Sequence, residues 1–385
     1  MSTAREKVII AGSGKMARDV GMFFLGRGHD VAWLSRDAAR LDSLAAWVRK
    51  RIARLASIVP CWSPGEPGFF VVGDPTIPDA DVFIESINEE LEEKRALLAA
   101  LDSVIPPGAM RLTGSSSILP DAIHPACAGL HFFYPVELTG LVEAVFPDDY
   151  HGPDRERVIA LLRRSELEHI EEAPAAAFSV NRLLLPVQNE CFRALAAGVP
   201  APEVDRASVS PVLPLGQLVL MDSIGLDVVY PAVRNFTMRV SPDLALQYAP
   251  LVDGLRSCLE MGKRGHKNRD GLMLGAPLPW CGHVACDEET RRNLGEMLQA
   301  LFVNTCFHAV EHRLLSPRDL ELALCSLFGW DRPLEDAWEP LGRARSREVL
   351  DDAFARTGLR YFMPTRELRR DCANGADADD IGPVI

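Results

Sequence analysis

A histidine and a glutamate in an apolar setting are the residues of this chain best suited to proton transfer. His131 lies within residues 129–135, which read GLHFFYP, and Glu143 follows Leu141 and Val142 on a short apolar run typical of a returning strand. An imidazole oriented by a buried carboxylate takes a proton from an alcohol, or returns one to a ketone, near neutral pH. The pair therefore predicts general acid–base chemistry. The alternative is that His131 is a hydrogen-bonded core histidine.

The first residues of the chain predict a site for a dinucleotide. A β-branched apolar run at residues 7–11 indicates a buried strand, and the sequence GSGKMA follows it and opens a helix predicted over residues 16–25. A second strand, predicted over residues 30–34, completes the β-α-β unit that this glycine pattern requires. Phosphates bind at such a helix N-terminus because free amides and the helix dipole favour anions. The candidate cofactor-binding residues here are Gly12, Gly14, Lys15 and Met16.

The end of the second strand bears on the choice between NAD and NADP. An acidic residue at this position would bind the ribose hydroxyls of NAD, but the sequence has Ser35, Arg36 and Asp37. A hydroxyl beside a guanidinium suits a 2′-phosphate, because arginine pairs with phosphate through forked, charge-assisted hydrogen bonds. Asp37 is the alternative ligand for an unphosphorylated ribose. Ser35 and Arg36 are therefore candidate cofactor-binding residues, with a lean towards NADP.

Size, charge and cysteine content narrow the class of protein. The chain has 385 residues, enough for two or three domains, and a net charge of −13, which argues against nucleic acid as a partner. Neither a signal peptide nor a membrane-spanning run is expected. The nine scattered cysteines are typical of reduced, buried thiols in a cytoplasmic protein. A cluster of Cys281, His283 and Cys286 lacks a convincing fourth ligand, so no metal is predicted.

Residues 129–143 resemble the Gly-Leu-His-Phe-Phe-Asn-Pro…Leu-Val-Glu signature of L-3-hydroxyacyl-CoA dehydrogenases, with Tyr134 in place of the asparagine. The resemblance implies an α/β Rossmann-type N-terminal domain followed by all-α C-terminal domains. It also implies an enzyme that transfers hydride between NAD or NADP and C3 of a 3-hydroxyacyl or 3-ketoacyl thioester. His131 is then the general acid/base, and Glu143 fixes its tautomer.

Further segments of the family pattern extend this resemblance. A Val-Glu-Ala-x-x-Glu-x-x-x-x-Lys pattern maps onto Glu85, Glu89 and Lys94, which implies that Glu89 and Lys94 lie near the nicotinamide ribose. The family has Asn-Thr-Ser-Ser where this chain has Gly114 and three serines, and Ser116 takes the place of the serine that binds the substrate oxygen. Asn181, on a predicted helix over residues 178–198, corresponds to the asparagine on the thioester side of the site. The basic residues of the predicted helix 38–57 are either a solvated face or a landing site for coenzyme A phosphates.

The pattern along the chain predicts four segments. Residues 1–172 form the dinucleotide-binding domain, 173–275 a helical domain, 276–370 a second, degenerate helical copy, and 371–385 a disordered tail. The two copies are inferred from residues that recur 115 positions apart, as Asn189 does at Asn304. The first copy resembles a domain that usually dimerises, so the second is expected to cover the same apolar face within one chain. Monomer and homodimer both remain open.

The expected substrate is an acyl-CoA or an acyl-carrier-protein thioester. One alternative is a dehydrogenase of the same fold that acts on a free hydroxy acid, as in the sugar-acid dehydrogenases related to lambda-crystallin, which share the His/Glu pair. A second is a biosynthetic ketoreductase on a carrier-bound thioester, which Ser35 and Arg36 favour. The departures from the family pattern at Gly114, at Tyr134 and at Ala176-Ala177, where the family has Pro-Gly, favour it too. The third is a nucleotide-binding or scaffold protein without catalytic activity. The set of His131, Glu143 and Asn181 argues against this last reading.

Overall fold

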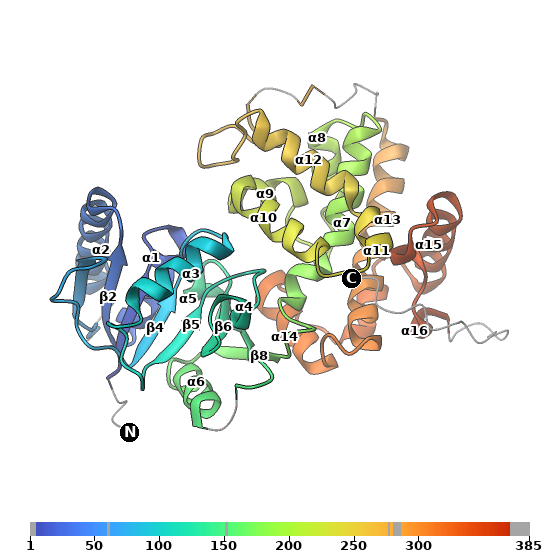
Figure 1. The fold of residues 1–385 in the computed structure, drawn as a ribbon. Helices are drawn as coiled ribbons and strands as arrows, with labels where there is room; N and C mark the ends of the chain where they lie inside the picture. The colour runs from blue at the N-terminus through green and yellow to red at the C-terminus, as the bar shows by residue number, and fades with distance from the viewer. Residues whose placement is uncertain (1–4, 60–61, 151–152, 276–277, 280–285, 370–385) are drawn as a thin grey trace. The chain divides into compact units, whose positions relative to one another are not determined.

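The computed structural model describes residues 5–59, 62–150, 153–275, 278–279 and 286–369. The chain divides into two compact units, Met1–Phe178 and Ser179–Ile385, each described here by itself (Figure 1). The first unit combines a sheet with helices, and every regular element of the second is helical within the described residues. This arrangement confirms the predicted fold class. None of the described helices has the length and apolar character needed to cross a membrane.

An eight-stranded sheet forms the centre of the first unit. Its order is β3-β2-β1-β4-β5-β6-β7-β8, in which only β6 and β7 pair antiparallel. The strand order reverses between β1 and β4, which is where sheets of this type bind ligands, beyond the carboxyl ends of the strands. The strands are β1 (Lys7–Ala11), β2 (Asp30–Ser35), β3 (Pro67–Val71), β4 (Val82–Glu85), β5 (Met110–Thr113), β6 (Cys127–Phe132), β7 (Leu141–Val145) and β8 (Glu168–Glu172).

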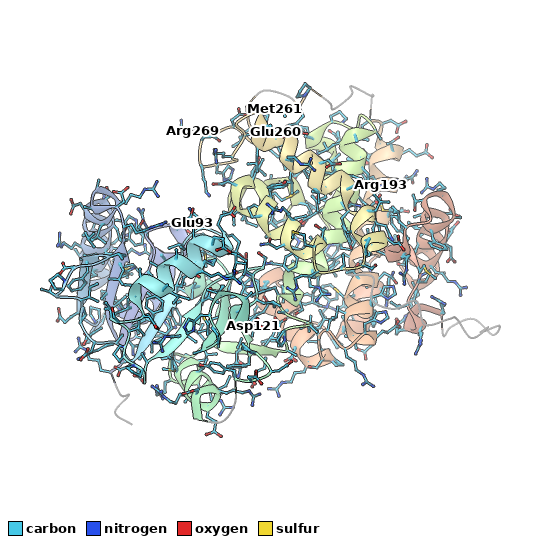
Figure 2. The ribbon with its side chains drawn as sticks, viewed as in Figure 1. Glu93, Asp121, Arg193, Glu260, Met261 and Arg269 are labelled. Carbon is cyan, nitrogen blue, oxygen red and sulfur yellow. The ribbon has the colours of Figure 1, made fainter. Side chains whose placement is uncertain are left out.

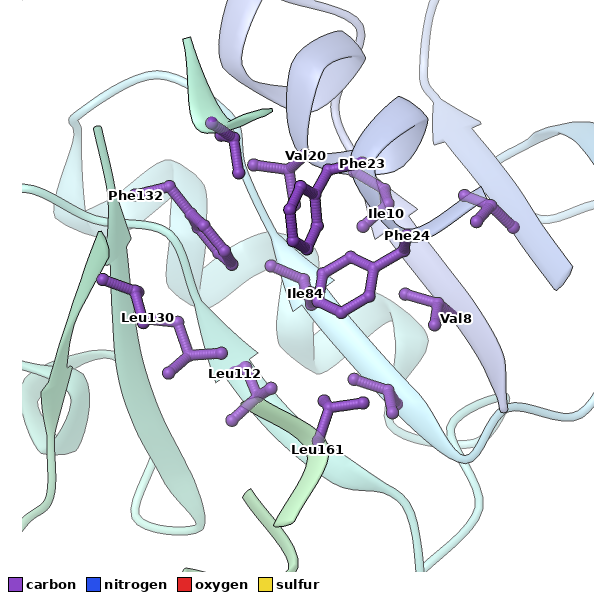
Figure 3. Close-up of a cluster of buried hydrophobic side chains, with 14 of the residues drawn as sticks. Val8, Ile10, Val20, Phe23, Phe24, Ile84, Leu112, Leu130, Phe132 and Leu161 are labelled. Carbon is purple, nitrogen blue, oxygen red and sulfur yellow. The ribbon is translucent and has the colours of Figure 1, made fainter. Parts of the chain in front are cut away.

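Helices cover both faces of this sheet because alternate strand residues point to opposite sides. Val8 and Ile10 of β1 belong to the buried cluster that contains Phe23 and Phe24 of α1 (Figure 3). Ile9 belongs to a second cluster, which contains Leu97 and Leu98 of α3. The helices of the first unit are α1 (Lys15–Gly26), α2 (Ala38–Ile58), α3 (Leu91–Leu101), α4 (Pro120–Ile123), α5 (Val136–Thr139) and α6 (Pro153–Arg164).

The elements that the sequence predicts at the start of the chain are present. The strand predicted over residues 7–11 is β1, the helix predicted over 16–25 is α1, and the helix predicted over 38–57 is α2. Glu85 of the matched family pattern is the last residue of β4, which covers Val82–Glu85. No prediction was made for β3 or β8. The sequence of β8 is EHIEE, which lacks the apolar pattern of a strand. Only two of its five residues are buried.

The second unit is built around a pair of long helices that pack together, α7 (Ser179–Ala196) and α13 (Glu288–Glu311). Asn189 on α7 and Asn304 on α13 are the residues related by the predicted repeat, and both are fully buried. The remaining helices are α8 (Ala201–Ala207), α9 (Gln217–Ile224), α10 (Leu226–Thr237), α11 (Pro242–Gln247), α12 (Ala249–Glu260), α14 (Pro317–Phe328), η1 (Leu334–Trp338), α15 (Arg343–Thr357), η2 (Arg360–Phe362) and α16 (Arg366–Arg369).

The two repeated asparagines bind one segment near the end of the described chain. Asn189 Nδ2 donates to Tyr361 Oη at 2.9 Å, and Asn304 Nδ2 donates to the Met363 carbonyl at 2.9 Å. Asn304 Oδ1 also accepts from the Thr365 amide at 3.0 Å. Buried amide side chains need such partners, because an unpaired one costs about 1–3 kcal/mol. Asn189 and Asn304 therefore both bind the segment of residues 361–365.

The described cysteines are free thiols, and most of them are buried, as the sequence suggested. Burial raises the pKa of the Cys191 and Cys306 thiols, which makes them inert in the folded protein. Cys325 on α14 differs, since it is exposed. Cys281 and His283 of the rejected metal cluster, and the tail predicted to be disordered, lie outside the described residues.

Candidate active site

His131 and Glu143 face each other across the antiparallel pair β6–β7. They are register partners in the ladder, and His131 Nδ1 lies 2.5 Å from Glu143 Oε2. A carboxylate only accepts hydrogen bonds, so Nδ1 donates and Nε2 is left as the basic nitrogen of a neutral ring. Glu143 is fully buried, whereas His131 is 7% exposed. The structure therefore brings the two predicted residues into contact, and the role of His131 as a general base stays a prediction.

Two aromatic rings pack edge-on against the imidazole, and neither is predicted from the sequence as a site residue. The ring centroid of His131 lies 4.5 Å from that of Phe133 and 5.9 Å from that of Phe178, both edge-on. Phe178 has a positive φ of 62°, and its amide donates to Glu172 Oε2 of β8 at 2.6 Å. This bond helps to keep an uncommon backbone conformation at the residue after Ala177. It explains how the chain turns here without the family's Pro-Gly.

A buried cation links two carboxylates beyond the end of β4. Lys94 Nζ donates to both oxygens of Glu85, at 2.8 and 2.9 Å, and lies 3.5 Å from Glu89 Oε2. Burial alone lowers the pKa of Lys94, but the charges of Glu85 and Glu89 outweigh it and raise the pKa above its ordinary value. Lys94 is 1% exposed. The Lys94 ammonium group therefore forms ion pairs with both Glu85 and Glu89.

The three serines after β5 all donate hydrogen bonds to the same carboxylate. Glu89 Oε1 accepts from Ser115 Oγ at 2.6 Å, from Ser117 Oγ at 2.7 Å and from Ser116 Oγ at 3.3 Å. Burial alone raises the pKa of Glu89, but the Lys94 charge and these serine hydrogen bonds hold it below its ordinary value. Of the three serines, only Ser116 is predicted from the sequence as a site residue. The sequence signal for Ser115 and Ser117 is that the three serines are consecutive.

The turn after β1 fits the pyrophosphate of a dinucleotide. A Cβ at Gly12 would lie 2.2 Å from the Ser86 carbonyl oxygen, whereas a Cβ at Gly14 would meet nothing within 4 Å. Gly14 precedes α1, and within the described part of the chain no side chain caps this helix. A helix N-terminus without a side-chain cap favours an anionic ligand, because the amides and the dipole of the helix attract negative charge. The side chain of Met16 packs against the core, so only its backbone is available there.

Substitution of Gly12 tests whether the turn after β1 is constrained as described. We expect Gly12→Ala to destabilise the protein by about 2 kcal/mol or more, because φ is +145° and the added carbon meets a carbonyl. The variant should also lose dinucleotide binding. Gly14→Ala is the matched control for folding, since its φ is −73° and the space is open. Urea unfolding compares the two, and equal midpoints would show that the turn is not constrained as described.

The other residues predicted to bind the cofactor have partners within the first unit. Ser35 is buried, and its Oγ accepts from the Asp37 amide at 3.1 Å. The Arg36 guanidinium pairs with Glu93 of α3 at 2.9 Å, and Figure 2 labels Glu93 at the outside of that helix. Lys15 Nζ lies 3.6 Å from the centroid of the Tyr134 ring. Tyr134, which departs from the family signature, is thus placed beside the glycine turn.

Asn181 lies in the first turn of α7, at the start of the second unit. His131, Glu143 and Ser116 belong to the first unit, so the approach of Asn181 to a shared substrate stays a prediction. Within the described residues, no group of three or more His, Cys, Asp or Glu side chains could hold a metal ion.

Two family descriptions match this chain. The description "3-hydroxyacyl-CoA dehydrogenase, NAD binding domain" matches residues 68–160, and "3-hydroxyacyl-CoA dehydrogenase, C-terminal domain" matches residues 178–273. The first match contains His131, Glu143, Ser116, Glu89 and Lys94, and the second contains Asn181. The glycine turn lies before the first match, so its assignment rests on the geometry above.

Curated relatives and solved structures agree with these matches. A 3-hydroxybutyryl-CoA dehydrogenase of Clostridioides difficile is 27% identical over 272 residues, which are 67% of this chain and 96% of that protein. A 3-hydroxyadipyl-CoA dehydrogenase of Escherichia coli K12 is 31% identical over 236 residues, 58% of this chain but only 50% of that protein. A solved 3-hydroxybutyryl-CoA dehydrogenase of Escherichia coli K12 has the same fold, with a TM-score of 0.72, 20% identity and coverage of 96% of this chain and 98% of that one.

Proposed function

Because this chain belongs to the 3-hydroxyacyl-CoA dehydrogenase family, we propose that it transfers hydride between a nicotinamide cofactor and C3 of a 3-hydroxyacyl or 3-ketoacyl thioester. The observation that carries the proposal is the hydrogen bond of 2.5 Å between His131 and Glu143. It lies in the domain whose glycine turn fits a dinucleotide. An oriented base and a dinucleotide cradle on one sheet are what a hydroxyl-oxidising enzyme needs.

In the oxidative direction, Nε2 of His131 takes the proton of the C3 hydroxyl. A nicotinamide dinucleotide held at the turn of Gly12 and Gly14 would supply the hydride acceptor for C3. Glu143 keeps the proton on Nδ1 and stabilises the imidazolium that forms, since its buried carboxylate lies against that nitrogen. In this proposal Ser116 binds the reacting oxygen. The role of Asn181 at the thioester carbonyl rests on the family resemblance alone, because Asn181 lies in the second unit. In the reductive direction, the protonated His131 returns its proton to the oxygen at C3.

The domain is of the NAD-binding type, and we propose that NADP(H) is preferred. The absence of an acidic side chain at Ser35 supports this preference. The thioester is either coenzyme A-bound or carrier-bound, and the names of the two curated relatives favour coenzyme A. The second helical copy covers α7 within the same chain, for which the packing of α7 on α13 is the support. The free buried thiols are consistent with action in the cytoplasm.

The decisive experiment follows absorbance at 340 nm with acetoacetyl-CoA and either NADH or NADPH. We expect the signal to fall rapidly with at least one of the two. The faster cofactor tests the proposed preference. If neither reacts while the cofactor is shown to bind, the thioester assignment to coenzyme A is wrong. Acetoacetyl-carrier protein and a free 3-hydroxy acid then separate the carrier-bound reading from the free-acid reading.

A further inference from the structure

A pocket lies beside the glycine turn, at the start of α1 and α2. It has a volume of about 470 Å³ and is lined by Ser13, Gly14, Arg18, Ala39, Arg40 and Ser43. Two of these six residues carry a guanidinium group and two carry a hydroxyl group, and none of the six is acidic. A pocket of this composition favours a dianion, because guanidinium groups form forked, charge-assisted hydrogen bonds with phosphate.

The end of β2 lacks the carboxylate that would oppose such a ligand. Ser35 occupies the last position of the strand and is buried, with its hydroxyl bonded to the Asp37 amide. Asp37 is the nearest acidic residue along the chain, and its Oδ1 accepts from the Arg40 amide at 3.1 Å as the cap of α2. Its Oδ2 lies 3.3 Å from Arg40 Nε. The Asp37 carboxylate therefore caps the start of α2 and contacts Arg40.

The two arginines of the pocket each contact a protein oxygen through Nε. Arg18 Nε donates to the Ser13 carbonyl at 3.1 Å, and its guanidinium carbon lies 5.8 Å from the centroid of the Trp47 ring. Arg40 is oriented by Asp37 through Nε. A guanidinium has five N–H donors, so a bond at Nε leaves the two terminal nitrogens for a ligand. Both side chains thus have donors left for a ligand, and the Arg18 side chain is also held by its hydrogen bond to the Ser13 carbonyl.

We propose that Arg18 and Arg40, together with the hydroxyls of Ser13 and Ser43, bind the 2′-phosphate of NADP(H) and select it over NAD(H). The assignment rests on the proposed function, which makes the ligand of this domain a nicotinamide dinucleotide. It adds two arginines on neighbouring helices to Ser35 and Arg36 as the residues that decide the choice of cofactor.

Isothermal titration calorimetry tests this selection without turnover. The probes are NADPH and NADH, and 2′,5′-ADP and 5′-AMP, which differ by the 2′-phosphate alone. We expect the wild type to bind NADPH at least about tenfold more tightly than NADH. Arg18→Gln and Arg40→Gln should each weaken NADPH and 2′,5′-ADP by roughly 10- to 100-fold, the effect of one charge-assisted bond. NADH and 5′-AMP should change by less than about threefold.

Arg163→Gln is the matched control, since it removes the same charge from an exposed position of α6. That helix packs on β5 and β8, away from β2 in the strand order. The proposal is overturned if the wild type binds NADH as tightly as NADPH, or if the arginine variants weaken both cofactors equally. Selective NADPH binding without thioester turnover would contradict the proposed function but support this assignment.

Discussion

Replacing His131 by glutamine should lower kcat by about 10²–10⁴-fold and leave the affinity for the cofactor nearly unchanged. General acid–base catalysis by one positioned side chain contributes an effect of that size. Glutamine has a similar reach and keeps a polar group opposite Glu143, but it cannot take the substrate proton. The rate is measured at 340 nm with saturating cofactor and acetoacetyl-CoA, and cofactor binding is measured separately by calorimetry. Turnover equal to the wild type would contradict the proposed mechanism.

His169→Gln provides the control for this variant. His169 lies on β8 of the same sheet and is a register partner of Val142, one residue from Glu143. The structure places it outside the proposed chemistry, so its replacement should leave kcat within about threefold of the wild type. If both variants lost turnover equally, the cause would be damage to the sheet at β6–β8 and not the loss of a base. The comparison therefore separates chemistry from folding.

The sequence sufficed to place His131 and Glu143, because both lie on adjacent strands joined by a short connection. Their spacing and the apolar residues around them predict an antiparallel pair, and the structure has them in register. The glycine turn was equally local: strand, turn and helix follow each other within residues 7–26. Patterns of this kind are read well from one sequence, since the interacting residues are close along the chain.

The contacts that sequence reasoning missed join residues far apart in the chain. Glu89 accepts hydrogen bonds from the serines after β5, which are 26–28 positions away. Arg18 and Arg40 line one pocket although they lie on different helices. Phe178 reaches the His131 ring from beyond β8. Such contacts depend on the strand order and on side-chain directions, neither of which the sequence pattern specifies.

Replacing Lys94 by methionine should destabilise the protein by about 3–5 kcal/mol at pH 7. The substitution keeps the length of the side chain but leaves the buried Glu85 carboxylate without its cation, and loss of one partner of a buried ion pair has this cost. Urea unfolding gives the free energy. Lys263→Met is the matched control, because Lys263 is also buried but its partner Asp270 is 37% exposed. We expect the control to lose clearly less stability.

The pH dependence of the same variant identifies the cause of that loss. In the wild type, the lowered pKa of Glu89 contributes stability that is present above pH 4.5 and is lost as the pH falls through the folded-state pKa. Without Lys94, the attraction that lowers this pKa is gone, while burial still raises it. In the variant, protonation of a glutamate removes an unpaired buried charge. The difference in the free energy of unfolding between the variant and the wild type should therefore shrink between about pH 7 and pH 4. A deficit that stays constant over this range would mean that methionine disrupts packing and that the charge of Lys94 is not what holds the two glutamates in place.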